Sequence, residues 1–309
     1  NTVGVNMVAI GYSALSGNTT GDYNVAVGYN AMVVNTTGIQ NVAIGGFALD
    51  ANVIGVNNVA IGHGSLSAST ADYNTAVGYN ALTANTTGTQ NIAIGPFSSD
   101  ANTTGARNTA VGYNSFTANT IGTDNVAVGA NALDANTIGT ANVAAGYNSL
   151  GANTPGANNV AVGWGSLAAN TIGTRQVGVG YEALLSNTTG DNNTAVGMRV
   201  MRTNTTGSNN VAMGDDALRS NTVADDNVAI GYNAMYANTT GVSNVAVGAY
   251  ALDANTVGTQ NVAVGSISLG ANTTGVNNTA VGYNSLAANT VGDGNVAVGS
   301  SALAVNTTG

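Results

Sequence analysis

Hydrophobic and polar positions recur at a fixed interval along the whole chain. We number the positions of one repeat from 0 to 16, with position 0 just before a Val-Ala-Val run, as at Asn24. Successive copies are seventeen residues apart, except for sixteen between Asn58 and Asn74. Self-similarity at a short fixed period is typical of a solenoid, in which each repeat forms one coil. The sequence therefore predicts a single continuous repeat array over residues 1–309.

Two apolar segments of each repeat predict the elements of a coil. Positions 1 to 3 read Val-Ala-Val in most repeats, and a short β-branched run that ends at Gly indicates a strand. Positions 7 to 10, such as residues 81–84 (Ala-Leu-Thr-Ala), predict a second short extended segment. Asn, Thr and Gly at positions 11, 12 and 14 are typical of a turn. We therefore predict an all-β fold, a parallel β-solenoid or β-roll of about 18 coils.

Several repeated residues carry predictions of their own. Position 4 is Gly in all eighteen repeats, which indicates either a steric clash or a positive φ angle. Stacked coils bring the Asn of position 11 and the Thr of position 12 over their own copies, so we expect ladders of polar contacts. In the shortened repeat Ser69 and Ala71 replace the usual Asn and Gly, and we expect a tighter loop without a change of strand register.

Position 2 is Ala in seventeen repeats and Gly in the other. Alternate residues of a strand face opposite sides, so position 2 has a face to itself. No polar residue occurs there, and we expect a second chain to pack against it. We therefore predict a homo-oligomer, with three chains about a common axis. The candidate interface residues are Ala26, Ala76, Ala127, Ala161, Ala212 and Ala263.

Residues 41–45, Asn-Val-Ala-Ile-Gly, recur as NVAVG or NTAVG and are followed after two residues by Ala or Ser. This pattern resembles the head repeat of trimeric autotransporter adhesins, the YadA-type heads, and the similar repeats of phage tail fibres. The resemblance implies trimeric β-rolls that stand off a surface. It implies a non-enzymatic structural fibre or adhesin segment that is extracellular, on a cell surface or on a virion. Its expected partners are further copies of the chain and a cell-surface glycan or protein receptor.

The charge of the chain limits its other partners. It has no Lys, five Arg and fourteen acidic residues, for a net charge of -9. This balance argues against nucleic acid and anionic membranes as partners. No apolar run is long enough to predict membrane insertion. The chain has no Cys, so we expect neither disulfides nor thiolate metal sites.

The sequence gives little support for a catalytic or metal site. Such a site needs different side chains to converge, whereas a repeat carries the same few side chains in every coil. His63 is the only His and is interpreted as an exposed loop residue. Asp22, Asp191 and the pair Asp225 and Asp226 could coordinate calcium, but position 15 is as often Thr, Val or Ala. We therefore expect no catalytic residue, no cofactor and no metal site.

Aromatic residues at position 5, directly after the repeated Gly, form the candidate binding surface. Exposed aromatic rings can stack on sugars or anchor an interface, or each ring can simply cover its own turn. The sequence favours the last interpretation, because the column is interrupted at Gly46, Pro96, Ala130, Asp215 and Ser300. The candidate residues are Tyr12, Tyr29, Tyr79, Tyr113, Tyr147, Trp164, Tyr181, Tyr232 and Tyr283.

Two further functions stay open. Residues 1–6 and 306–309 are ordinary repeat sequence from the same loop, without the polar cap of a solenoid end. This suggests an internal segment of a longer fibre, or a self-assembling extracellular filament subunit whose ends stack. An ice-binding β-solenoid needs two Thr columns on one face. Adjacent residues such as Thr86 and Thr87 are expected to point in opposite directions, which weakens that alternative.

Overall fold

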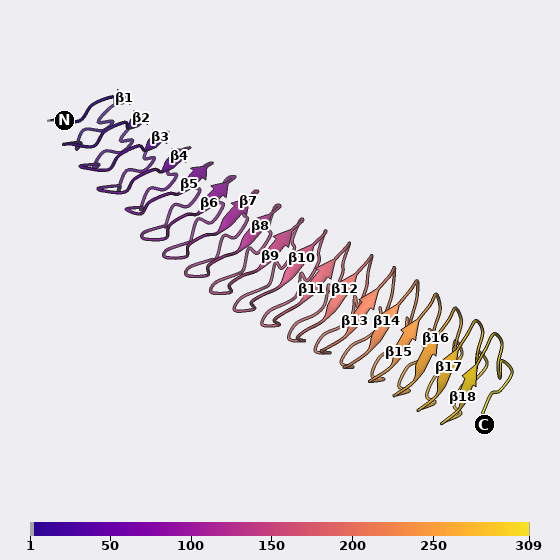
Figure 1. Ribbon diagram of the computed structural model, residues 1–309. Coiled ribbons are helices and arrows are strands. Elements are labelled where there is room, and N and C mark those ends of the chain that lie inside the picture. Colours follow the sequence, from indigo (N-terminus) through magenta and orange to yellow (C-terminus); the bar gives the residue numbers. More distant parts are fainter. Residues whose placement is uncertain (1–2, 309) are drawn as a thin grey trace. The chain divides into compact units, whose positions relative to one another are not determined.

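The computed structural model describes residues 3–308; residues 1, 2 and 309 lie outside, so the two terminal loops are described only in part. The chain divides into two compact units, Asn1–Ala157 and Asn158–Gly309. Each unit is a stack of coils with one short strand per coil (Figure 1). The prediction of an all-β solenoid with one coil per repeat is confirmed within each unit.

The strands of the first unit occupy positions 1 to 3 of their repeats. Within its described part they are β1 (Val8–Ile10), β2 (Val25–Val27), β3 (Val42–Ile44), β4 (Val59–Ile61), β5 (Thr75–Val77), β6 (Ile92–Ile94), β7 (Thr109–Val111), β8 (Val126–Val128) and β9 (Val143–Ala145). Those of the second unit, up to residue 308, are β10 (Val160–Val162), β11 (Val177–Val179), β12 (Thr194–Val196), β13 (Val211–Met213), β14 (Val228–Ile230), β15 (Val245–Val247), β16 (Val262–Val264), β17 (Thr279–Val281) and β18 (Val296–Val298).

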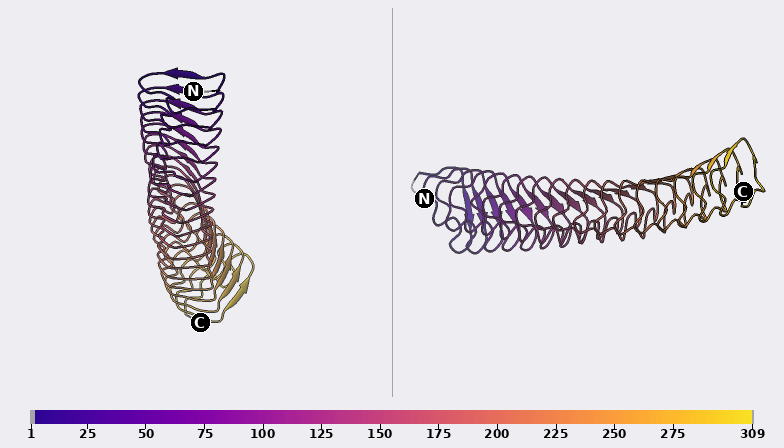
Figure 2. Two further views of the ribbon diagram at one scale, coloured as in Figure 1. Left: turned by 90° about the vertical axis from the view of Figure 1, so that its left-hand side faces the viewer. Right: turned by 90° about the horizontal axis from the view of Figure 1, so that it is seen from below.

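Consecutive strands of a unit pair in parallel and in register, so every repeat position lies over its own copy. Ala26 pairs with Ala43, for example. Figure 2 shows the strands of each unit side by side, pointing the same way. The shortened repeat keeps this register, because Thr75 pairs with Val59. The predicted tight loop without a register change is therefore confirmed.

The second predicted strand is absent. Position 8 has a left-handed backbone in every described repeat, as at Met32 (φ 50°). Ala31 and Met32 are neighbours and both are fully buried, whereas a strand with one face open to solvent would expose one of them. This segment is a turn that still bonds to the next coil, because the Met32 N–H donates to the Ala48 carbonyl at 3.0 Å. The prediction of extended structure at positions 7 to 10 is wrong.

The core of each unit is thin and consists of positions 2, 7 and 8, which are mostly Ala, Ala or Ser, and Leu. The Ala column of position 2 points into this core. At Gly178, the one Gly in that column, an added Cβ would lie 2.6 Å from Ser166 Oγ and 3.3 Å from the Leu167 side chain. The coil is therefore narrow opposite Leu, in agreement with the Ala or Gly found at position 2 of every repeat.

This placement overturns the predicted oligomer interface. The six candidate alanines are 0% exposed inside the coil of their own chain, so no second chain can reach them. They are Ala26, Ala76, Ala127, Ala161, Ala212 and Ala263. Their lack of polar replacements reflects the chain's own core, not a subunit contact.

Two columns of buried Asn cross the interior between coils. At position 11, the Asn35 Nδ2 donates to Asn18 Oδ1 at 2.8 Å and to the Gly38 carbonyl at 3.1 Å. At position 0, the main-chain N–H of Asn41 donates to Asn24 Oδ1 at 3.0 Å, and Asn24 Nδ2 donates to the Gly38 carbonyl at 2.7 Å. The predicted Asn ladder is confirmed, and a second ladder runs beside it.

Thr at position 12 forms a ladder on the outside of the same turn. The Thr86 hydroxyl donates to the Thr103 carbonyl at 3.0 Å, and the Thr103 hydroxyl donates to the Thr120 carbonyl at 2.9 Å. The predicted Thr ladder is confirmed, with main-chain carbonyls as the acceptors. These hydroxyls are thereby engaged within the stack.

The Gly of position 4 is required for both of the reasons considered. Gly45 has φ 139°, a region that side-chain-bearing residues rarely adopt. A Cβ at Gly45 would also lie 2.5 Å from the Gly62 carbonyl oxygen of the next coil. Gly at this position lets the strand end while the coils stay at strand spacing.

Neighbouring glycines give a matched test of this requirement. Gly45→Ala should lower the free energy of unfolding by about 3 kcal/mol or more, because both the φ angle and the carbonyl contact oppose a side chain. A Cβ at Gly46 would have its nearest contact at 3.4 Å, from a His63 ring atom. Gly46→Ala should therefore stay within about 0.5 kcal/mol of the parent in urea unfolding. Equal losses in the two variants would contradict the assigned role.

Candidate functional site

The aromatic side chains at positions 5 and 6 gather on the outside of the first unit. One ring from each of seven consecutive coils forms a continuous row, with ring centroids 5.2 to 6.3 Å apart. We call this set the aromatic row. Its members are Tyr12, Tyr29, Phe47, His63, Tyr79, Phe97 and Tyr113.

Two members of the aromatic row come from position 6 and were missed in the sequence. At Gly46 and Pro96 the position 5 ring is absent, but Phe47 and Phe97 follow directly and place their rings in the row. The interruptions expected at Gly46 and Pro96 are therefore filled. The sequence did contain an indication of these two members. Two of the three Phe of the chain directly follow a position 5 residue that has no aromatic ring.

The rings of the row take two orientations. Tyr12 and Tyr29 are stacked with an interplanar angle of 12°, and His63 and Tyr79 are stacked at 20°. Phe47 instead stands at 70° to both of its neighbours. Stacked rings cover one another's faces, whereas an edge-to-face pair covers the face of only one of its two rings. Phe97 repeats this arrangement, at 78° and 85° to its neighbours.

The second unit has shorter aromatic runs. Trp164 and Tyr181 stack with centroids 5.2 Å apart, and Tyr232 meets Tyr250 edge to face at 5.3 Å. All nine predicted position 5 aromatics are exposed, with 47% to 72% of each residue accessible. Their position outside the coil is confirmed, and a ligand role for them stays a prediction. The nine are Tyr12, Tyr29, Tyr79, Tyr113, Tyr147, Trp164, Tyr181, Tyr232 and Tyr283.

Aspartates at position 9 lie beside the position 6 column. A Cβ at Gly270 (position 9) would lie 3.1 Å from Ile267 of position 6 and 3.4 Å from Asp253 of the preceding coil. Partial burial raises the pKa of Asp50 and Asp100, against the opposing effect of main-chain hydrogen bonds. The same cause raises the pKa of Asp134 and Asp253. Each of these carboxyls therefore holds its proton to a higher pH than an exposed Asp does.

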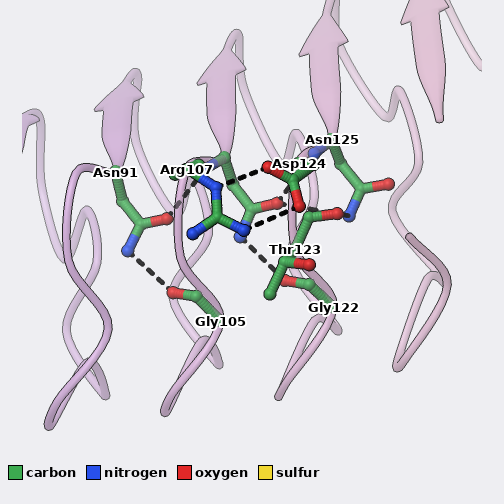
Figure 3. Close-up of polar contacts among 8 residues, drawn as sticks. Asn91, Gly105, Arg107, Gly122, Thr123, Asp124 and Asn125 are labelled. Carbon is green, nitrogen blue, oxygen red and sulfur yellow. Dashed lines mark hydrogen bonds and ion pairs between the residues drawn. The ribbon is translucent and has the colours of Figure 1, made fainter. Parts of the chain in front are cut away.

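The five Arg contact acidic, amide or phenol groups of other coils. In the first unit, Arg107 pairs with Asp124 at 2.6 Å, beside the position 0 Asn column in Figure 3. In the second unit, Arg199 pairs with Asp216 at 3.0 Å and Arg202 with Glu182 at 2.6 Å. The other two bond to Asn192 and Tyr236. These contacts link coils, and they account for all of the chain's Arg side chains.

The aspartates considered as calcium ligands accept hydrogen bonds from the preceding coil. Asp22 Oδ1 accepts the Val5 N–H at 2.7 Å, and Asp191 Oδ1 accepts the Thr174 N–H at 2.6 Å. Asp225 is bonded in the same way. Among residues 3–308 no three His, Asp or Glu side chains lie together as metal ligands would. His63 is exposed and lies in the aromatic row.

The outward side of each strand forms an apolar sheet face, made of positions 1 and 3. These positions hold only Val, Ile, Thr, Ala or Met in the eighteen repeats. Ile44, Val128 and Val162 are 39% to 40% exposed, values typical of side chains that flank their own copies on an open surface. The apolar sheet face, and not the Ala column, is the surface that another chain can reach.

Thr pairs at positions 12 and 13 also differ from expectation. Thr86 and Thr87 are both exposed, because they lie in a bend and not in a strand. The strand geometry behind the predicted opposite directions is therefore absent here, and the directions themselves stay a prediction. Only the second Thr of the pair keeps a hydroxyl free of the position 12 ladder, and position 13 changes to Ile or Val in several repeats.

Comparison of the chain with protein-family models and with curated proteins finds no match. The described residues contain no helix long and apolar enough to cross a membrane. The resemblance to adhesin heads and tail fibres therefore rests on the repeat sequence itself.

Proposed function

We propose that this chain is a non-enzymatic structural segment of an extracellular or virion-borne fibre, which displays side-chain columns on its outside. The observation that carries the proposal is the bonding between coils, which is the same from coil to coil. Each coil offers its successor the same strand edge and, in nearly every repeat, the same two Asn oxygens. Length then increases by whole repeats without any new packing problem.

The variation among repeats supports a display role. Interior positions hold nearly one residue type each, whereas positions 5, 6, 9, 13 and 15 change from coil to coil. A fibre or adhesin segment needs this combination of a constant frame and a variable exterior. The ice-binding alternative has weaker support, because the position 12 hydroxyls are donated to main-chain carbonyls.

Deletion of one whole repeat tests the structural role. Removing residues 108–124 joins position 16 to position 0, so the coils on both sides keep their contacts. The shortened chain should fold with little change in unfolding midpoint and lose about 5 Å of rise along the stack, measured by cryo-electron microscopy. Removing only residues 108–115 is the control and should prevent folding of the first unit. Loss of folding on whole-repeat deletion would contradict the proposal.

We infer that copies of the chain associate through the apolar sheet face. Nine strands at ~4.8 Å spacing and a width of ~10 Å give each unit roughly 400 Å² of uncharged surface. A patch of roughly 400 Å² is about the size of the largest apolar patch on a typical soluble protein, and patches of that kind are often functional. The resemblance to adhesin heads suggests three chains, and the filament alternative would add end-to-end contacts.

Charges on the apolar sheet face should weaken this association. The double variant Val111→Glu, Val128→Glu should raise the dissociation constant about tenfold or more, because burying unpaired carboxylates is costly. The control Ile121→Glu, Ile138→Glu alters exposed residues of the same coils on another side and should leave it unchanged. Sedimentation equilibrium distinguishes the two. A parent chain that stays monomeric at high concentration would contradict the inference.

A further inference from the structure

We propose that the aromatic row of the first unit binds a neutral, linear polysaccharide that lies along the stack of coils. The proposal rests on the proposed function, since it names the ligand that a displayed surface would take. It assigns ligand contacts to Phe47 and Phe97, which hold the row together where position 5 lacks a ring.

The continuity of the row is more than the fold requires. The coil that carries Ala130 and Asn131 has no ring at either position, yet it keeps strand β8 and a fully buried Leu133. A ring is therefore not needed to cover a turn. An aromatic ring is nevertheless present in seven consecutive coils of the first unit. In two of them the ring comes from position 6 and not from position 5, and it still lies in the row. This compensation indicates that the row itself has a use.

The geometry of the row suits a long, repetitive partner. Seven rings span six coil spacings, roughly 29 Å at ~4.8 Å per coil. Phe47 and Phe97 lie three coils apart, and each meets its neighbours in the row edge to face, without stacking on them. A sugar ring has an apolar C–H face that packs on an aromatic face. A linear polymer of such rings can contact both Phe positions and the His63 and Tyr79 rings between them.

Polar groups along the row match the hydroxyl edge of a sugar chain. Tyr29, Tyr79 and Tyr113 are about half exposed and carry phenol hydroxyls that can both donate and accept. Asp50 and Asp100, three residues after Phe47 and Phe97, supply carboxyl oxygens on the neighbouring column. Buried or partly buried hydrogen bonds of this kind would fix the orientation of the bound chain.

Charge selects a neutral ligand over an anionic one. Arg107 is the only Arg of residues 1–157, and it is paired with Asp124. The carboxyls near the row would repel nucleic acid and acidic polysaccharides. A protein partner is less favoured than a glycan, because the row repeats the same contact at each coil and offers no cavity for an anchoring side chain, and no pocket occurs within residues 3–308.

The test is calorimetric titration of the full chain with three neutral hexasaccharides: the β-1,4-linked oligomers of glucose and of N-acetylglucosamine, and the α-1,4-linked oligomer of glucose. At least one should bind. The double variant Phe47→Asn, Phe97→Asn should weaken that binding about tenfold or more, since it removes both turned rings. Asn occupies position 6 in other coils, as at Asn30 and Asn80, so the variant should keep the parent's urea midpoint.

A matched control removes rings outside the row. Tyr232→Ser with Tyr250→Asn alters an isolated pair in the second unit and should change the affinity less than about twofold. The variant Phe47→Tyr, Phe97→Tyr should bind as the parent does. Absence of binding by all three sugars, equal effects of the two ring-removing variants, or row-dependent binding of a protein alone would overturn the proposal. None of these results would alter the outcome of the whole-repeat deletion, so the two proposals fail independently.

Discussion

The main-chain carbonyl of position 14, usually Gly, is the hydrogen-bond acceptor on which the packing of each coil depends. Gly105 illustrates it, because its carbonyl accepts from Asn91 Nδ2 at 2.8 Å and from Asn102 Nδ2 at 3.0 Å. One buried acceptor thus ties together the two Asn columns. A Cβ at Gly105 would lie 2.4 Å from both Asn102 Oδ1 and the Gly122 carbonyl, so this coil leaves no room for a side chain there. Where Ala224 takes the position, its carbonyl still accepts from Asn210 and Asn221. An unpaired amide in such a site would cost several kcal/mol, which leaves little freedom for the coil to shift.

The exterior follows from this interior constraint. An apolar core of Ala and Leu tolerates sliding of one coil over another, but directional hydrogen bonds between Asn side chains do not. Once the register is fixed, each outward position becomes a column at strand spacing. The aromatic row, the Thr ladder, the Arg pairs and the apolar sheet face are all such columns. Substitutions at outward positions therefore change the surface of the fibre without changing the hydrogen bonds between its coils.

The sequence was sufficient for those features that depend on repetition alone. The period, the strand at Val25–Val27, the Asn and Thr ladders and the need for Gly45 all follow from stacking identical coils. The sequence did not show which face of the strand points into the core, because Val-Ala-Val is apolar on both sides. The narrow core decides it, because a Cβ at Gly178 would already meet Ser166 Oγ at 2.6 Å and the Leu167 side chain at 3.3 Å.

Two other features could not be predicted from the sequence pattern: the turn at positions 7 to 10 and the aromatic row. Leu82 has φ 52°, a conformation that Leu avoids on its own. The bonds to adjacent coils impose it, so the pattern of positions 7 to 10 resembled a strand while the chain forms a turn. The aromatic row escaped because Phe47 lies one residue away from the position 5 column. Its place became evident only when the ring centroids were compared between coils.

The central claim, that buried Asn ladders fix the stack, is tested most directly by the unfolding free energy of Asn119→Asp. Asn119 Nδ2 donates to Asn102 Oδ1 at 2.6 Å and to the Gly122 carbonyl at 3.2 Å, and a carboxylate can serve neither acceptor. The account predicts a loss of about 3 kcal/mol or more at neutral pH, against less than about 1 kcal/mol for Asn114→Asp at position 6 of the same coil. Equal small losses in the two variants would contradict it.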